Sequence, residues 1–158
     1  MSKEFVFSEN IFSNKTLFLF VKLMLLFGAL SARSMFITEN RGWGIAFCCI
    51  SLFFLFYVFN YRVLIIQVDE DELRLKFGLF TWHIHLSNIE TSFLDKTSLW
   101  RIGGAGIHFS PIGGRYRAMF NFLEYDRVVI CLKEKKGLVR DIAFSTRQPD
   151  ELMRLLKS

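Results

Sequence analysis

Residues 42–61 read GWGIAFCCISLFFLFYVFNY, a run of twenty positions without a charged side chain. In an α-helix, which rises about 1.5 Å per residue, this segment is about 30 Å long and matches the hydrocarbon core of a bilayer. Trp43 and Tyr61 stand at its two ends, where amphipathic aromatic rings favour the membrane interface. The segment therefore predicts a transmembrane helix, and it places the protein in a lipid bilayer.

A second apolar segment, Leu17–Ile37, lies just before the first. Lys22 and Arg33 interrupt it, but their long side chains can snorkel to the membrane surface. A short polar turn joins the two segments, which predicts an antiparallel helical hairpin over residues 16–62, preceded by an N-terminal interfacial segment at residues 1–15. The alternative is a signal peptide cleaved near Ala29-Leu30-Ser31, although two acidic residues make its N-terminal region atypical.

Small residues recur at four-residue spacing in both predicted helices. This spacing lets two transmembrane helices approach closely, so we expect helix–helix packing at Gly28, Ala32, Gly44 and Cys48. Basic residues are more frequent before the first helix than in the turn between the helices, which favours cytoplasmic N- and C-termini.

Residues 63–158 have the alternating pattern of half-buried strands. Leu73–Phe77 and Phe80–Ser87 flank a turn at Gly78, and Arg127–Lys133 and Leu138–Phe144 flank a turn at Gly137, so each pair predicts a β-hairpin. Pro149 suits the first turn of a closing helix. Together these elements predict an antiparallel β-barrel or two packed sheets with a C-terminal helix.

The opening hairpin and the end of this region resemble bacterial pleckstrin-homology-like (bacterial PH) domains. Leu73–Ile89 contains Ile84-His85-Leu86-Ser87-Asn88-Ile89, which is similar to the family pattern Ile-Pro-Leu-Ser-x-Ile, with His85 in place of Pro. Thr146-Arg147-Gln148-Pro149-Asp150-Glu151-Leu152 is similar to the Thr-x-x-Pro-Glu-x-Leu start of the family's closing helix. The glycine-rich segments between them are similar to those of membrane-anchored members, in which two transmembrane helices precede the domain.

The resemblance implies an α+β protein in which an N-terminal transmembrane helical hairpin precedes a PH-like antiparallel β-barrel or sandwich closed by a C-terminal helix. It also implies multi-pass insertion in a bacterial cytoplasmic (inner) membrane. It does not imply phosphoinositide binding, because bacterial members often have no assigned ligand.

The segment from Lys96 to Leu123 is the candidate binding surface, because it combines basic residues with glycines and has no acidic residue. Exposed glycines leave backbone N–H groups free to face an anion, and arginines donate bidentate hydrogen bonds to phosphate. The candidate anion- or lipid-binding residues are Lys96, Arg101, Gly113, Gly114, Arg115 and Arg117. In the alternative interpretation the glycines form turns, while the arginines are solvated or pair with Glu124 and Asp126.

Other chemistries lack a sufficient pattern. His83 and His85 share one strand face, but an exposed face explains them better than a metal site. Asp69-Glu70-Asp71-Glu72 reads as a solvated turn, and the three cysteines have no metal or disulfide spacing. The formal net charge of +5 forms no dense stripe, which argues against nucleic acid as a partner. We therefore expect no catalytic residues, no enzyme activity, no metal and no cofactor.

Three functions fit the sequence. The first is a non-enzymatic, membrane-anchored scaffold that recruits a protein partner, or forms a homo-oligomer, at the inner membrane face. The second is a reader of anionic lipid headgroups in which Arg115 and Arg117 bind phosphate. The third is an immunity or envelope-stress protein that blocks a membrane-active peptide through its hairpin.

Overall fold

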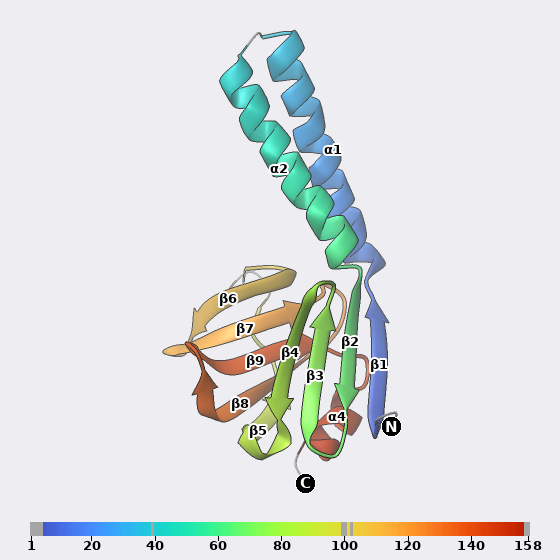
Figure 1. Cartoon of the computed structure of the whole chain (residues 1–158), viewed down its shortest axis with the longest axis vertical. Helices are drawn as coiled ribbons and strands as arrows, with labels where there is room; N and C mark the ends of the chain where they lie inside the picture. Colours follow the sequence, from blue (N-terminus) through green and yellow to red (C-terminus); the bar gives the residue numbers. More distant parts are fainter. Residues whose placement is uncertain (1–4, 39, 99–100, 102, 157–158) are drawn as a thin grey trace.

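The computed structural model describes residues 5–38, 40–98, 101 and 103–156 and divides them into a helical hairpin and a β unit (Figure 1). The hairpin consists of α1 (Asn14–Phe36) and α2 (Arg41–Asn60). Ser13 caps α1 by accepting a hydrogen bond from the Thr16 N–H at 3.0 Å. Both helices are long and apolar enough to cross a membrane. This agrees with the transmembrane hairpin expected at residues 16–62.

The first sheet has four antiparallel strands in the order β1-β2-β3-β4. They are β1 (Phe7–Phe12), β2 (Val63–Val68), β3 (Glu72–Phe77) and β4 (Phe80–His85). The hairpin predicted around Gly78 is confirmed, with Phe77 paired to Phe80 and a φ of 61° at Gly78. A left-handed backbone at this turn explains why glycine occupies it.

Strand β1 was not anticipated, because residues 1–15 were expected to be an interfacial segment. Phe12 pairs with Val63 and Phe7 with Val68, so β1 and β2 form an antiparallel ladder across the base of the helical hairpin. The chain thus runs from β1 into α1 and returns from α2 into β2 (Figure 1). The β unit therefore includes residues on both sides of the hairpin, not only residues 63–158.

The second sheet has five strands in the order β5-β8-β9-β7-β6. They are β5 (Ile89–Leu94), β6 (Gly106–Ile112), β7 (Arg115–Asn121), β8 (Arg127–Lys136) and β9 (Val139–Ser145). A 3₁₀ turn, η1 (Leu86–Asn88), connects β4 to β5, and the predicted hairpin at Gly137 is confirmed. Strands β7 and β9 pair in parallel, which corrects the expectation of a wholly antiparallel structure.

The two sheets pack face to face, and the strands of the second sheet run across those of the first (Figure 1). Phe77 from the first sheet and Phe120, Phe122 and Phe144 from the second are fully buried between them. The sheets are not closed into one barrel, so the sandwich alternative describes them better. Helix α4 (Pro149–Leu155) covers the end opposite the helical hairpin with buried Leu152.

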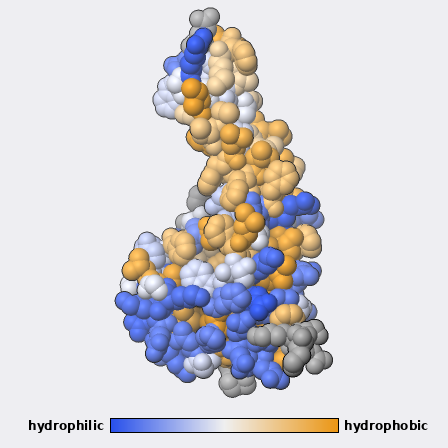
Figure 2. Space-filling view, in the orientation of Figure 1, coloured by the Kyte–Doolittle hydropathy of each residue, from blue (hydrophilic) through white to orange (hydrophobic). Residues whose placement is uncertain are grey.

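The hairpin exposes most of its apolar surface. Only 17% of the most apolar window of α1 and 6% of that of α2 are buried. Figure 2 shows hydrophobic residues along the helices and mainly hydrophilic residues at the far end of the β unit. The N- and C-termini both lie at that far end, so the hairpin leaves the β unit and returns to it (Figure 1).

Candidate functional site

The six residues predicted to bind anions occupy two places on the five-stranded sheet. Lys96 and Arg101 lie in the segment that follows β5, while Gly113 and Gly114 form the turn between β6 and β7. Arg115 and Arg117 lie on β7. The positive φ angles of 59° at Gly113 and 78° at Gly114 explain the glycines as turn residues.

Arg117 is buried, and two carboxylates face its guanidinium group. Its Nη2 lies 3.4 Å from Asp141 Oδ2, and its Nη1 lies 3.7 Å from Asp95 Oδ1. Arg117 and Asp141 are opposite each other on the parallel strands β7 and β9. A buried charge needs such partners because its desolvation is costly. Arg117 is therefore part of a structural ion-pair network and does not present a free phosphate donor.

The network continues on both sides of Arg117. Arg115 Nη1 lies 3.5 Å from Asp141 Oδ1, and Arg127 Nε donates to Asp95 Oδ2 at 3.1 Å. The guanidinium of Arg127 also donates to the carbonyl oxygen of Thr97. The network contains three arginines and two aspartates, so its net charge is +1. The half-exposed Arg115 is its outermost member.

Asp95 is the most strongly held carboxylate of this network. Burial on its own raises the pKa of Asp95, but hydrogen bonds from Thr97 and Arg127, together with the charge of Arg127, lower that pKa below its ordinary value of 3.8. The Thr97 N–H donates to Asp95 Oδ1 at 2.9 Å. Asp95 therefore remains ionised at neutral pH and compensates the arginines around it.

The partners of these arginines differ from those that sequence proximity suggested. Glu124 and Asp126 were the expected acidic neighbours, whereas the contacts are made by Asp95 and Asp141. Asp95 directly follows β5, and Asp141 lies on β9, 24 positions after Arg117 along the chain. The compensation comes from strand pairing across the sheet, which a local charge count does not reveal.

A groove remains beside this network, at the end of β5 and along the segment that follows it. It has a volume of about 560 Å³ and is lined by Phe93, Leu94, Asp95, Lys96, Thr97, Ser98, Arg101 and Arg117. Phe93 and Leu94 are 43% and 37% exposed. Within the described residues, neither Lys96 nor Arg101 forms an ion pair. Two apolar side chains and two available cations therefore line one groove.

Asp69 and Glu72 of the acidic run, and His83 on β4, have structural partners. Asp69 Oδ1 accepts hydrogen bonds from the N–H groups of Asp71 and Glu72, which fixes the β2–β3 turn. Glu72 contacts Arg74 at 2.7 Å and His83 at 3.4 Å. In the part of the chain that the structure describes, no group of three or more His, Cys, Asp or Glu residues could hold a metal ion.

The helix contact involves part of the predicted small-residue set. A Cβ atom at Gly28 would lie 3.4 Å from Ser51 Oγ, and one at Gly44 would lie 2.5 Å from Met35 Cγ. Cys48 is half-buried, whereas Ala32 is exposed and the preceding Ser31 is buried in its place. Ser31 Oγ donates to the Gly44 carbonyl oxygen at 2.7 Å. This hydrogen bond shows that α1 faces α2 through position 31 near the turn, one position before the one that the four-residue spacing indicated.

Sequence reasoning also missed a buried carboxylate that joins β1 to the end of the second sheet. Glu9 is 6% exposed, and its two oxygens accept hydrogen bonds from Thr146 Oγ1 at 2.6 Å and from the Arg147 N–H at 3.0 Å. Arg147 also donates to the Asn10 carbonyl oxygen at 2.7 Å. These bonds cover the outer edge of β1. The only sequence signal is an acidic residue between two apolar positions.

Comparison of the chain with protein-family models, with curated proteins and with solved structures finds no significant match. The resemblance to bacterial PH-like domains therefore stays a prediction based on the residues quoted for it.

Proposed function

We propose that this chain is a non-enzymatic, membrane-anchored scaffold that recruits a protein partner at the inner face of a bacterial membrane. In this proposal α1 and α2 cross the bilayer, and the PH-like β unit lies on the cytoplasmic surface with both termini. The exposed apolar surface of the two helices supports insertion, since apolar side chains on this scale are stable only when lipid or protein covers them.

The way the β unit joins the helices supports a scaffold role. Strand β1 leads into α1, strand β2 follows α2, and the two strands pair with each other. No flexible linker therefore separates these helices from the sheet. Tyr125 Oη donates to the Phe12 carbonyl oxygen at 2.7 Å, and the Leu123 N–H donates to Thr16 Oγ1 at 3.2 Å. The β unit therefore keeps one orientation relative to the helices and presents the same surface to its partner.

The groove at the end of β5, which is an edge strand of its sheet, is the observation that carries the proposal. An edge strand offers unpaired backbone groups to an added strand, while pockets beside it select side chains. Phe93 and Leu94 suit apolar side chains, and Lys96 and Arg101 suit acidic ones. The proposed partner is therefore a protein with an extended segment that carries both apolar and acidic residues.

Photocrosslinking of the full chain in native membranes tests this proposal. A photoreactive residue at position 94 should crosslink to one partner, and the charge reversals Lys96→Glu and Arg101→Glu should reduce the yield at least tenfold. Position 138, where Leu138 is 76% exposed on the β8–β9 turn, is the matched control. Equal crosslinking from position 138, or an unchanged yield after charge reversal, would exclude the β5 edge as the recruitment surface.

A further inference from the structure

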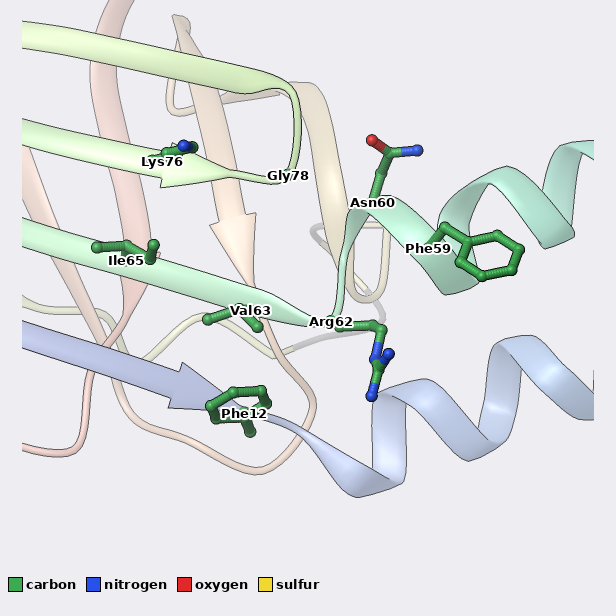
Figure 3. A pocket seen from close by; sticks show the side chains of 8 residues that line it. All are labelled: Phe12, Phe59, Asn60, Arg62, Val63, Ile65, Lys76 and Gly78. Carbon is green, nitrogen blue, oxygen red and sulfur yellow. The ribbon is translucent and has the colours of Figure 1, made fainter.

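A second pocket lies where the helical hairpin meets the four-stranded sheet (Figure 3). It has a volume of about 400 Å³ and is lined by Phe12, Phe59, Asn60, Arg62, Val63, Ile65, Lys76 and Gly78. The residues come from the end of α2, the end of β1, the start of β2 and the end of β3. Figure 3 shows Lys76 on β3 and Arg62 at the junction between α2 and β2.

The wall of this pocket on the sheet is apolar at β1 and β2, unlike the rest of that sheet face, and Lys76 on β3 borders it. The outward positions farther from the helices are polar, and they include Ser8, Asn10, Gln67 and Arg74. Beside the helices, the outward positions are Phe12 and its cross-strand partner Val63. Phe12 is 55% exposed and Phe59 is 68% exposed. The apolar surface of the hairpin thus continues onto the end of the sheet.

The two cations of the pocket differ from those on β7 because, in the described part of the chain, no carboxylate pairs with them. Among the described residues, neither Arg62 nor Lys76 forms an ion pair, and both side chains are exposed. Arg62 follows directly after the apolar end of α2, and Lys76 on β3 lies beside that end. Both are at the depth where phosphate groups of a bilayer are found. The pocket therefore combines an apolar side toward the helices with positive charge at the height of the headgroups.

We infer that this pocket binds the headgroup phosphate of one anionic phospholipid molecule. Arg62 donates hydrogen bonds to the phosphate oxygens, Lys76 supplies a second positive charge, and the acyl chains lie along Phe59 and the outer surface of α2. The inference rests on the membrane placement in the proposed function, but it uses residues other than those of the β5 edge. The pocket recognises a phosphate group, and we infer that this phosphate belongs to a membrane lipid.

The close approach of the β3–β4 turn to α2 makes the pocket a preformed one. A Cβ atom on Gly78 would lie 2.1 Å from the Asn60 carbonyl oxygen, so the turn packs directly on the last residue of the helix. Leu79, the next residue, is 79% exposed, so this end of the sheet presents an apolar side chain to the lipid. The backbone that carries Lys76 is thereby held against the end of the helix that leads into Arg62.

Lipid binding to the full chain in detergent, measured by native mass spectrometry, tests the inference. The probes are short-chain phosphatidylglycerol, short-chain phosphatidylcholine and glycerol 3-phosphate. One basic side chain near an anionic headgroup is worth about 1 kcal/mol, or about fivefold in affinity. We therefore expect Arg62→Gln with Lys76→Gln to weaken phosphatidylglycerol binding about 25-fold and to weaken phosphatidylcholine binding less, because the choline cation of that lipid already neutralises its phosphate.

The control removes the same charge elsewhere, with Lys135→Gln and Arg140→Gln at the β8–β9 end, and should keep the wild-type affinity for phosphatidylglycerol. Equal loss in the control and the test variant would overturn the inference, as would equal wild-type affinity for the two lipids. Tight binding of glycerol 3-phosphate without acyl chains would show that the ligand is a soluble phosphate. Equal wild-type affinities for the two lipids, with an intact position-94 crosslink, contradict this inference alone. Wild-type preference for phosphatidylglycerol without a position-94 crosslink contradicts the proposed function alone.

Discussion

Arg117 on β7 and Arg62 at the junction of α2 and β2 belong to the same β unit but have opposite surroundings. Arg117 is buried against Asp95 and Asp141, whereas Arg62 is exposed beside an apolar pocket and, among the described residues, forms no ion pair. A sequence count favours the β7 region, because no acidic residue lies within the segment around it. The structure supplies carboxylates from other strands to Arg117, so this arginine is not available to an anion, whereas Arg62 at the base of the helices is.

The largest expected effect comes from removing a carboxylate of the β7 network. Asp141→Leu should destabilise the chain by about 3 kcal/mol, because it leaves buried Arg117 with Asp95 as its remaining partner. For a domain of this size, that change lowers the melting temperature by roughly 6–12 °C. Thermal unfolding of the detergent-solubilised chain measures it.

Asp126→Leu is the matched control, because Asp126 is exposed and was one of the partners expected from sequence proximity. Its effect should stay within about 0.5 kcal/mol, as for most surface substitutions. Equal melting temperatures for the two variants would show that the network on β7 contributes no stability, and the basic surface predicted from the sequence would then regain its support.

The second effect concerns the junction and compares two glycines with similar φ angles, 61° at Gly78 and 64° at Gly137. An alanine at Gly137 meets no atom within 4 Å, so it should cost about 1 kcal/mol for the left-handed backbone. An alanine at Gly78 also meets the Asn60 carbonyl oxygen at 2.1 Å, and it should cost about 2–3 kcal/mol.

The difference between the two alanine variants isolates the packing of the β3–β4 turn on α2. It is measured by thermal unfolding of each variant, together with phosphatidylglycerol binding, which Gly78→Ala should weaken and Gly137→Ala should not. Indistinguishable melting temperatures would indicate that the turn moves freely away from the helix, and the pocket would then lose its rigid wall.

The parts of the fold that the sequence predicted correctly are local. Both β-hairpins follow from alternation on either side of a glycine turn. Both helices follow from apolar length, which is uninterrupted over residues 42–61 and interrupted by Lys22 and Arg33 in the first segment. Strand β1 has the same alternation, with Phe7 and Ile11 buried, but Glu9 occupies the inward position between them. Its carboxylate is stabilised by Thr146 and Arg147, more than 130 positions away, so the local pattern looked polar.

The candidate site was harder to predict for the same reason. The pairing of β7 with β9 in parallel brings Asp141 to Arg117, and no local signal distinguishes this arrangement from the antiparallel one that was expected. Arg62 and Lys76 are 14 positions apart and neighbour one pocket because β2 and β3 pair, with Ile65 opposite Lys76. A residue's charge is local information, but the neutralisation of that charge depends on the topology.

The smallest expected effect separates the two regions by their response to acid. The pKa of Asp95 lies below its ordinary value of 3.8 in the folded chain, so Asp95 stabilises the fold fully above pH 3.8 and loses that contribution as the pH falls further. Asp95→Asn should therefore lower the melting temperature at neutral pH and make progressively less difference as the pH falls below 3.8. Phosphatidylglycerol binding at Arg62 and Lys76 should change less than the melting temperature over the same range, because no carboxylate lines that pocket. Lipid binding could instead fall in parallel with the melting temperature, at a pH where the chain is still folded. This result would show that the charges of the two regions are coupled.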